Sequence, residues 1–146
     1  MHWHILPIVD PFQMPTRGLN PETGETDPES VGYDIYAPAD GFLDPLSRKL
    51  IPLGFRAEFA NDHVGRYMDR SGMANKGIHM LGGVIDPSYR DEWKLILFNT
   101  NGETFRWKRG DRIIQVVFMP IRKPVPQIVA SLSPSPRVGG LGSTGQ

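Results

Sequence analysis

Residues 82–89, GGVIDPSY, combine groups that could bind a flat ligand and activate water. The two glycines allow close backbone approach to such a ligand. Asp86 follows an apolar pair, and a half-buried carboxylate near phosphates can act as a general base. Tyr89 could stack on a ring. The same residues also fit an Asp-Pro turn followed by an exposed aromatic side chain.

Two other segments carry groups that bind phosphate. Arg70-Ser71-Gly72 offers a guanidinium fork, a hydroxyl and an accessible backbone amide. Residues 137–145, RVGGLGSTG, place glycine amides beside an arginine and two hydroxyls. No lysine precedes Ser143, so this is not a P-loop. Taken singly, the first segment also fits a solvated strand end, and the second a flexible linker.

Two polar residues stand among apolar neighbours that favour strands. Asp34 lies within GYDI, and Gln115 lies within IIQVVF. A polar side chain that points inward from a strand needs a partner or a function. Each could equally face solvent.

Length and composition restrict the class of protein. The 146 residues suffice for one domain. Lys plus Arg and Asp plus Glu both number 16, which argues against a nucleic-acid binder but not against a local phosphate site. With no cysteine, disulfides, thiol nucleophiles and Cys-ligated zinc are excluded.

The density of breakers predicts an all-β fold. The chain holds 16 Gly and 14 Pro, which long helices do not tolerate. Many short apolar runs separated by turn signals are typical of an all-β barrel or a jelly-roll-like sandwich. Strands are expected at residues 5–9, 32–36, 50–59, 64–69, 77–81, 93–98 and 113–118.

Two segments fall outside the predicted core. Residues 18–30 are acidic and rich in Pro and Gly, which predicts a surface loop inserted in a single domain over residues 1–130. Residues 131–146 form a C-terminal arm with too little apolar content to fold alone. Residues 1–10 do not resemble a signal peptide or a membrane span, so we expect a cytoplasmic protein without membrane partners.

Five of these segments, in chain order, resemble the motifs of the trimeric deoxyuridine triphosphatases (dUTPases). They are GYDI at 32–35, RSGMA at 70–74, GVIDPSYR at 83–90, GDRIIQ at 110–115 and GGLGSTG at 139–145. Each motif alone is weak, but the five together span nearly the whole chain. The resemblance implies a jelly-roll-like β-clip barrel that assembles as a homotrimer, with three active sites shared between subunits.

The resemblance also implies Mg²⁺-dependent hydrolysis of dUTP to dUMP and pyrophosphate, which keeps uracil out of DNA. Asp86 would activate the attacking water, Tyr89 would pack under the deoxyribose, and Asp34 would hold water on the Mg²⁺. The deoxyuridine would contact Gly83, Val84, Ile85, Asp86, Tyr89, Lys94 and Leu141. The phosphates would be held by Arg70, Ser71, Gly72, Gln115, Arg137, Gly142, Ser143 and Thr144.

The chain departs from the family pattern at several positions. Asp69 stands where many relatives have Pro, and Asp91 where Gly is usual. Leu141 replaces an aromatic residue that stacks on uracil, and the spacer between Arg137 and Gly139 is one residue short. These tail changes concern the geometry of the arm rather than the reaction.

Two alternative functions remain open from the sequence. The dCTP deaminases share the fold, but their catalytic glutamate aligns with Ile96 here, and residues 93–98 contain no carboxylate. A dUTPase-like regulatory module could bind a protein partner through residues 18–30, in the host cytosol if the chain is phage-encoded.

Overall fold

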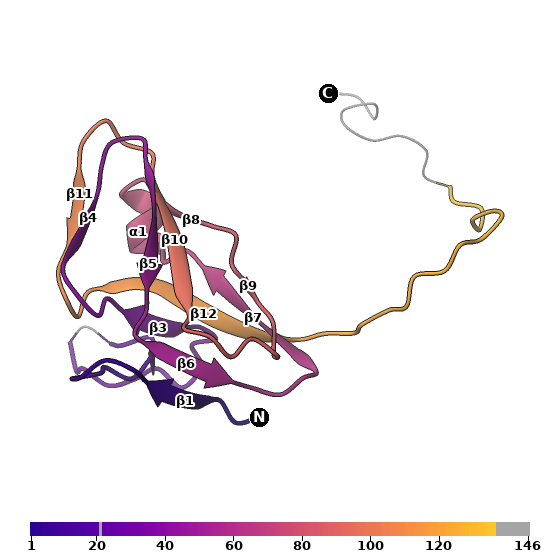
Figure 1. The fold of residues 1–146 in the computed structure, drawn as a ribbon, viewed down its shortest axis with the longest axis horizontal. Coiled ribbons are helices and arrows are strands. Elements are labelled where there is room, and N and C mark those ends of the chain that lie inside the picture. Colours follow the sequence, from indigo (N-terminus) through magenta and orange to yellow (C-terminus); the bar gives the residue numbers. More distant parts are fainter. Residues whose placement is uncertain (21, 137–146) are drawn as a thin grey trace.

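Short strands dominate the computed structural model, which describes residues 1–20 and 22–136 (Figure 1). A single short helix, α1 (Ser71–Asn75), interrupts them within these residues. The strands are β1 (His4–Pro7), β2 (Thr16–Arg17), β3 (Tyr33–Tyr36), β4 (Gly41–Leu43), β5 (Arg48–Pro52), β6 (Phe55–Glu58), β7 (His63–Met68), β8 (Ile78–Leu81), β9 (Val84–Ile85), β10 (Lys94–Asn99), β11 (Phe105–Trp107) and β12 (Arg112–Pro120).

The strands form four small sheets around one core, which confirms the predicted all-β class. The largest has the order β2-β3-β12-β7-β9, and a second has the order β5-β10-β8. Two-stranded sheets β1-β6 and β11-β4 complete the body. All the pairings are antiparallel. Neighbouring strands are often distant in sequence, so the barrel brings together segments from the whole chain.

Alternating burial explains why β10 and β12 organise the core. On β10 the side chains of Leu95 and Leu97 are buried, while those of Ile96 and Phe98 are half-buried. On β12 Ile114 and Val116 point inward, and Gln115 and Val117 lie on the opposite face. This period of two is the burial pattern of a strand with one face on a core. Trp93 and Phe55 pack between the sheets, with ring centroids 5.1 Å apart.

The prediction of one strand over residues 50–59 was wrong, because a glycine divides it. Gly54 has a φ of 77°, a left-handed conformation that ends β5 and lets β6 leave in another direction. A Cβ at Gly54 would also lie 2.6 Å from Val9 Cγ2. The apolar run was therefore correct, but it supplies strands to two different sheets.

Within the segment at residues 18–30, residues 22–29 are exposed. The loop continues from β2 and is closed by one bridge between Leu19 and Thr26. The Gly18 amide donates to Ser30 Oγ at 3.2 Å, and Arg17 Nη1 donates to the carbonyl of Pro28. The loop is thus anchored at its base, directly before β3.

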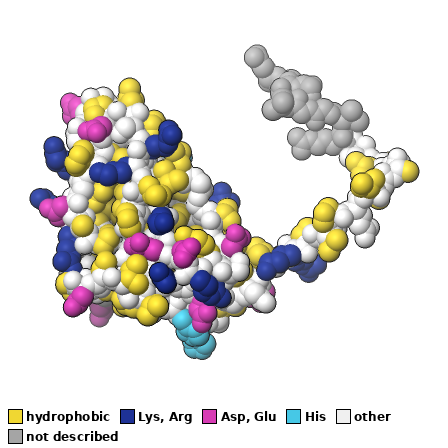
Figure 2. All heavy atoms as spheres, in the orientation of Figure 1, with side chains coloured by type: hydrophobic (Ala, Val, Ile, Leu, Met, Phe, Trp, Pro, Cys, Tyr) yellow, Lys and Arg dark blue, Asp and Glu magenta, His cyan; other side chains and the backbone are white. Residues whose placement is uncertain are grey.

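Beyond β12 the chain leaves the body of the domain. Residues 121–136 contain no helix or strand and project as an extended arm (Figures 1 and 2). Val125, Ile128, Val129 and Leu132 are all exposed on it. Among the described residues, no helix is long and apolar enough to cross a membrane.

The burial of β10 predicts a large effect of truncating its central leucine. Leu95 is fully buried, so Leu95→Ala should lower the free energy of unfolding by about 2–5 kcal/mol through lost contacts and a cavity. Denaturant unfolding measures this loss. Leu46→Ala, at a turn leucine that is 67% exposed, should unfold close to the wild type. Equal losses for both variants would contradict the position of the core.

Candidate active site

An apolar pocket of about 220 Å³ lies where β8, β9 and β10 converge. It contains all but one of the residues expected to contact a nucleoside. Its lining consists of Leu50, Tyr67, Leu81, Gly82, Gly83, Val84, Ile85, Asp86, Tyr89, Trp93, Lys94 and Ile96. The exception, Leu141, lies outside the described residues.

The glycine pair shapes one wall of this apolar pocket. Gly82 and Gly83 have φ angles of 76° and 102°, which turn the chain sharply between β8 and β9. The Gly83 carbonyl accepts a hydrogen bond from the Tyr67 amide at 2.8 Å. A Cβ at Gly82 would have open space, so a ligand can approach the backbone there.

Asp86 and Tyr89 stand at the rim of the pocket. The Asp86 side chain is exposed, and among the described residues it forms no hydrogen bond or ion pair. Tyr89 Oη donates to the Glu92 carbonyl at 3.0 Å, which fixes the ring 38% exposed beside the pocket. The arrangement therefore offers an uncommitted carboxylate next to a held aromatic ring.

Two buried aromatic residues in the pocket wall were not identified from the sequence. Tyr67 Oη and Trp93 Nε1 have no hydrogen-bond partner among the described atoms. Burial raises the pKa of the Tyr67 hydroxyl far above its ordinary value, and the nearby Tyr89 raises it further. Tyr67 therefore remains neutral and acts as a wall rather than as an acid or base.

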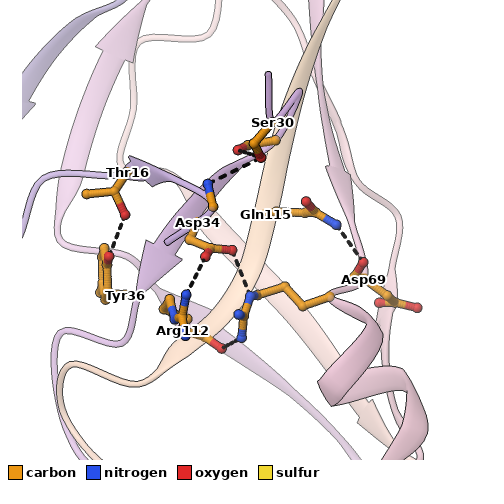
Figure 3. Close-up of polar contacts among 10 residues, drawn as sticks. Thr16, Ser30, Asp34, Tyr36, Asp69, Arg112 and Gln115 are labelled. Atoms are coloured by element: carbon orange, nitrogen blue, oxygen red, sulfur yellow. Dashed lines mark hydrogen bonds and ion pairs between the residues drawn. The ribbon is translucent and has the colours of Figure 1, made fainter. Parts of the chain in front are cut away.

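A buried carboxylate that does not line the apolar pocket joins two arginines (Figure 3). Asp34 is 6% exposed. Its Oδ1 accepts from Arg70 Nε at 2.7 Å, and its Oδ2 accepts from Arg112 Nη1 at 3.2 Å. Arg70 Nη1 also donates to the Arg112 carbonyl at 2.8 Å. Asp34 is thus covered by its two arginine partners and is not exposed to solvent.

Gln115 is fixed next to this network. Its Nε2 donates to the Asp69 carbonyl at 2.9 Å, directly before Arg70 (Figure 3). Gly32 makes room for it, since a Cβ there would lie 2.2 Å from Gln115 Oε1. The Asp69 carboxylate accepts from the Met80 amide at 2.8 Å and pairs with His79. These contacts tie β7, β8 and β12 to one turn.

The segment that contains Arg70, Ser71 and Gly72 begins a helix rather than simply ending a strand. Arg70 precedes α1, and Ser71 and Gly72 form its exposed first turn. A Cβ at Gly72 would meet nothing within 4 Å. An anion can therefore reach the amide and hydroxyl groups of this turn.

The residues expected to bind the nucleoside and those expected to bind the phosphates do not line one cavity in a single chain. The lining of the apolar pocket includes none of Asp34, Arg70, Ser71, Gly72 and Gln115. Four further predicted phosphate ligands, Arg137, Gly142, Ser143 and Thr144, lie outside the described residues. The sequence analysis assigned a role to Gln115 of the GDRIIQ segment but none to Arg112 of the same segment.

The described residues contain no cluster of three or more His, Asp or Glu side chains that could cage a metal ion. A carboxylate offers about four acceptor positions, so Asp34 can accept from a water while bound to both arginines. Such a water-mediated role suits a hard cation that keeps most of its hydration shell.

The family model described as dUTPase matches residues 22–145. The deoxyuridine 5'-triphosphate nucleotidohydrolase of Paramecium bursaria Chlorella virus 1 is 40% identical over 118 residues, which are 80% of this chain and 84% of the relative. The enzyme of the same name from Candida glabrata is 38% identical over 133 residues, covering 89% and 91%.

Solved structures of phage dUTPases share the fold. A variant of the Staphylococcus bacteriophage 80alpha dUTPase with dUpNHpp has a TM-score of 0.87 at 21% identity, covering 99% of this chain and 98% of that one. A variant of the phage phi11 dUTPase, described with a structural Mg(II) ion, has a TM-score of 0.78 at 20% identity, covering 90% and 98%.

Removing the shared carboxylate should destabilise the domain. Asp34→Ala leaves Arg70 and Arg112 without their common partner, and we expect a loss of about 1–3 kcal/mol in the free energy of unfolding. The control is Asp91→Ala, at an exposed carboxylate that forms no ion pair or side-chain hydrogen bond among the described residues, and it should change little. Denaturant unfolding of both variants decides, and equal stability of Asp34→Ala and wild type would contradict a structural role for the network.

Proposed function

The chain belongs to the dUTPase family and is a dUTP diphosphatase, and we propose that it hydrolyses dUTP with Asp86 as the base that activates water. The supporting observation is the Asp86 carboxylate, exposed at the rim of the apolar pocket and free of partners within the described residues. Asp86 takes a proton from water as the water oxygen attacks the α-phosphorus. The bond to the bridging oxygen breaks, which releases dUMP and pyrophosphate.

The apolar pocket holds the deoxyuridine. Backbone groups near Gly83 and Lys94 read the uracil edge, because the glycine turn exposes them. Val84 and Ile85 complete this wall. Tyr89 packs under the deoxyribose, held by its bond to the Glu92 carbonyl, and leaves no space for a 2'-hydroxyl. Leu141 of the arm covers the base.

The phosphates bind at the turn before α1. Arg70, fixed by Asp34, presents its charge there, and Ser71 and Gly72 add a hydroxyl and an open backbone. Gln115 lies beside them. Arg137, Gly142, Ser143 and Thr144 of the arm close over the triphosphate. This set of cationic and hydrogen-bonding groups suits phosphoryl transfer, which depends on positioning of the phosphates and on neutralisation of their charge.

Mg²⁺ is the metal that this donor set fits. When bound to the triphosphate oxygens, Mg²⁺ would neutralise their charge and orient the phosphates. Asp34 would hold water of its hydration shell through the acceptor positions that the arginines leave free. The metal would thus be carried by the substrate and waters rather than by a protein cage.

The working form is a homotrimer with active sites shared between subunits. The outer face of the sheet β2-β3-β12-β7-β9 carries a partly exposed apolar patch beside Asp34 and Gln115. Its apolar members are Val64, Met68, Val84, Val117 and Met119, and the exposed Arg66 lies among them, between Val117 and Val84. Covering this face with another subunit would bury apolar area and place the nucleoside residues of one chain near the phosphate residues of another. The exposed apolar residues of the arm also favour contact with another subunit.

The structure offers no support for the deaminase alternative. Ile96 lines the apolar pocket at the position where the deaminase glutamate would align. Asp86 is the only carboxylate among the described residues that line it. A protein partner at residues 18–30 would be additional to hydrolysis, because the loop lies outside the pocket lining.

Replacing the proposed base tests the reaction directly. Asp86→Asn keeps the shape of the side chain but cannot accept the proton, so turnover of dUTP should fall about 100-fold or more with nearly unchanged binding. Pyrophosphate release measures turnover, and calorimetry with a non-hydrolysable analogue measures binding. Turnover within a few-fold of wild type would remove Asp86 as the base.

The shared site predicts a link between assembly and activity. Light scattering should give a mass near three times the 16.3 kDa of the chain. Met119→Glu puts a charge opposite Val64 in the apolar patch and should dissociate the trimer and reduce hydrolysis at least tenfold. Thr104→Glu, at an exposed loop, should leave both unchanged. A fully active monomer would refute the shared site.

A further inference from the structure

A second hollow, here called the basic groove, lies next to the turn formed by residues 70–72, here called the phosphate turn. It has a volume of about 310 Å³ and lies between α1, β11 and the start of β12. Its lining residues are Arg70, Gly72, Met73, Lys76, Phe105, Arg106, Trp107, Asp111, Arg112 and Ile113. Arg70 and Gly72 therefore belong both to the phosphate turn and to the basic groove.

The basic groove carries unbalanced positive charge. Four of its residues are cations, and Asp111 is its one acid. Arg70 and Arg112 share Asp34, whereas Lys76 and Arg106 form no ion pair among the described residues. The Asp111 carboxylate already accepts from the Lys108 amide at 2.8 Å. An anion that enters the groove would meet two uncompensated charges.

The walls of the basic groove combine a fixed base with adaptable rims. Met73, Trp107 and Ile113 are buried in the core, which fixes the base. Lys76, directly after α1, and Arg106, on β11, both line the groove from exposed positions. Arg106 lies over the Phe42 ring, 5.4 Å from its centroid. Two cations that line one small hollow suit a compact, multiply charged anion.

We propose that the basic groove binds the pyrophosphate group, with Lys76 and Arg106 as its ligands. The choice of anion rests on the proposed function, because pyrophosphate is the leaving half of dUTP. Arg70 and Gly72 hold phosphates at one end of the groove, and the more highly charged half extends from there. Lys76 and Arg106 then stabilise the charge that accumulates as the bond to the α-phosphate breaks.

Calorimetric titration with inorganic pyrophosphate tests the site without catalysis. Lys76→Ala and Arg106→Ala should each weaken binding about fivefold at low salt, and the double variant further. Arg106→Lys should retain most of the affinity, and the differences should shrink as ionic strength rises. Both side chains are exposed, so folding should persist, and melting temperatures verify it.

Lys49→Ala is the matched control. Lys49 Nζ lies 4.3 Å from the centroid of the same Phe42 ring, but Lys49 does not line the basic groove. Its replacement removes one nearby positive charge and should change pyrophosphate affinity less than twofold. If Lys49→Ala weakens binding as much as Arg106→Ala, the effect is general electrostatics and the proposed site is wrong.

Steady-state kinetics with dUTP separates this proposal from the proposed function. A rise in KM or in the inhibition constant of pyrophosphate for Lys76→Ala and Arg106→Ala, but not for Lys49→Ala, supports the groove. Wild-type pyrophosphate affinity in the double variant overturns the groove while leaving dUTP hydrolysis intact. Selective loss of pyrophosphate binding in a chain that does not hydrolyse dUTP would instead retain the groove and overturn the proposed function.

Discussion

The site depends on one buried carboxylate that connects two positive charges. Asp34 on β3 binds two arginines: Arg70, which directly precedes α1, and Arg112, the first residue of β12. Without the carboxylate between them, the two positively charged guanidinium groups would repel each other. The turn before α1 can therefore hold a concentrated positive charge in a fixed orientation. Gln115 binds the carbonyl that precedes Arg70, and both arginines line the basic groove.

This arrangement also explains why one chain presents two incomplete sites. The glycine turn joins β8 to β9 and Asp86 follows β9, while the arginine network belongs to β3, β12 and the residue before α1. A triphosphate ester needs both an apolar recess for its base and a polar cradle for its charge. In the proposed trimer, each subunit would supply one of these to a neighbour, so the apolar outer sheet face would serve assembly and catalysis together.

The sequence was sufficient for the fold class, because that class depends on local patterns, whereas the roles of the site residues stay predictions. The apolar run IIQVVF marked a strand, and GGVID indicated a turn followed by a carboxylate. Gly54 shows the limit: composition favoured one strand over residues 50–59, and the break follows from a backbone angle that packing against Val9 selects. The partner of Asp34 was equally beyond reach, since Arg112 lies 78 residues away and meets it only through strand pairing. Tyr67 and Trp93 were missed because buried aromatics on strands look the same whether they line a pocket or fill a core.

The positions of the tryptophans give the molecule its own optical reporters. Trp93 is in the wall of the apolar pocket and stacks on Trp3 at 5.5 Å between ring centroids. Trp107 is in the wall of the basic groove, and its indole Nε1 donates to the Ala39 carbonyl at 3.1 Å. These are the three tryptophans of the chain. In the proposed complex, intrinsic fluorescence would therefore follow the base and the phosphates of the nucleotide through different tryptophans, and replacing Trp107 by Phe would leave a signal from the nucleoside end.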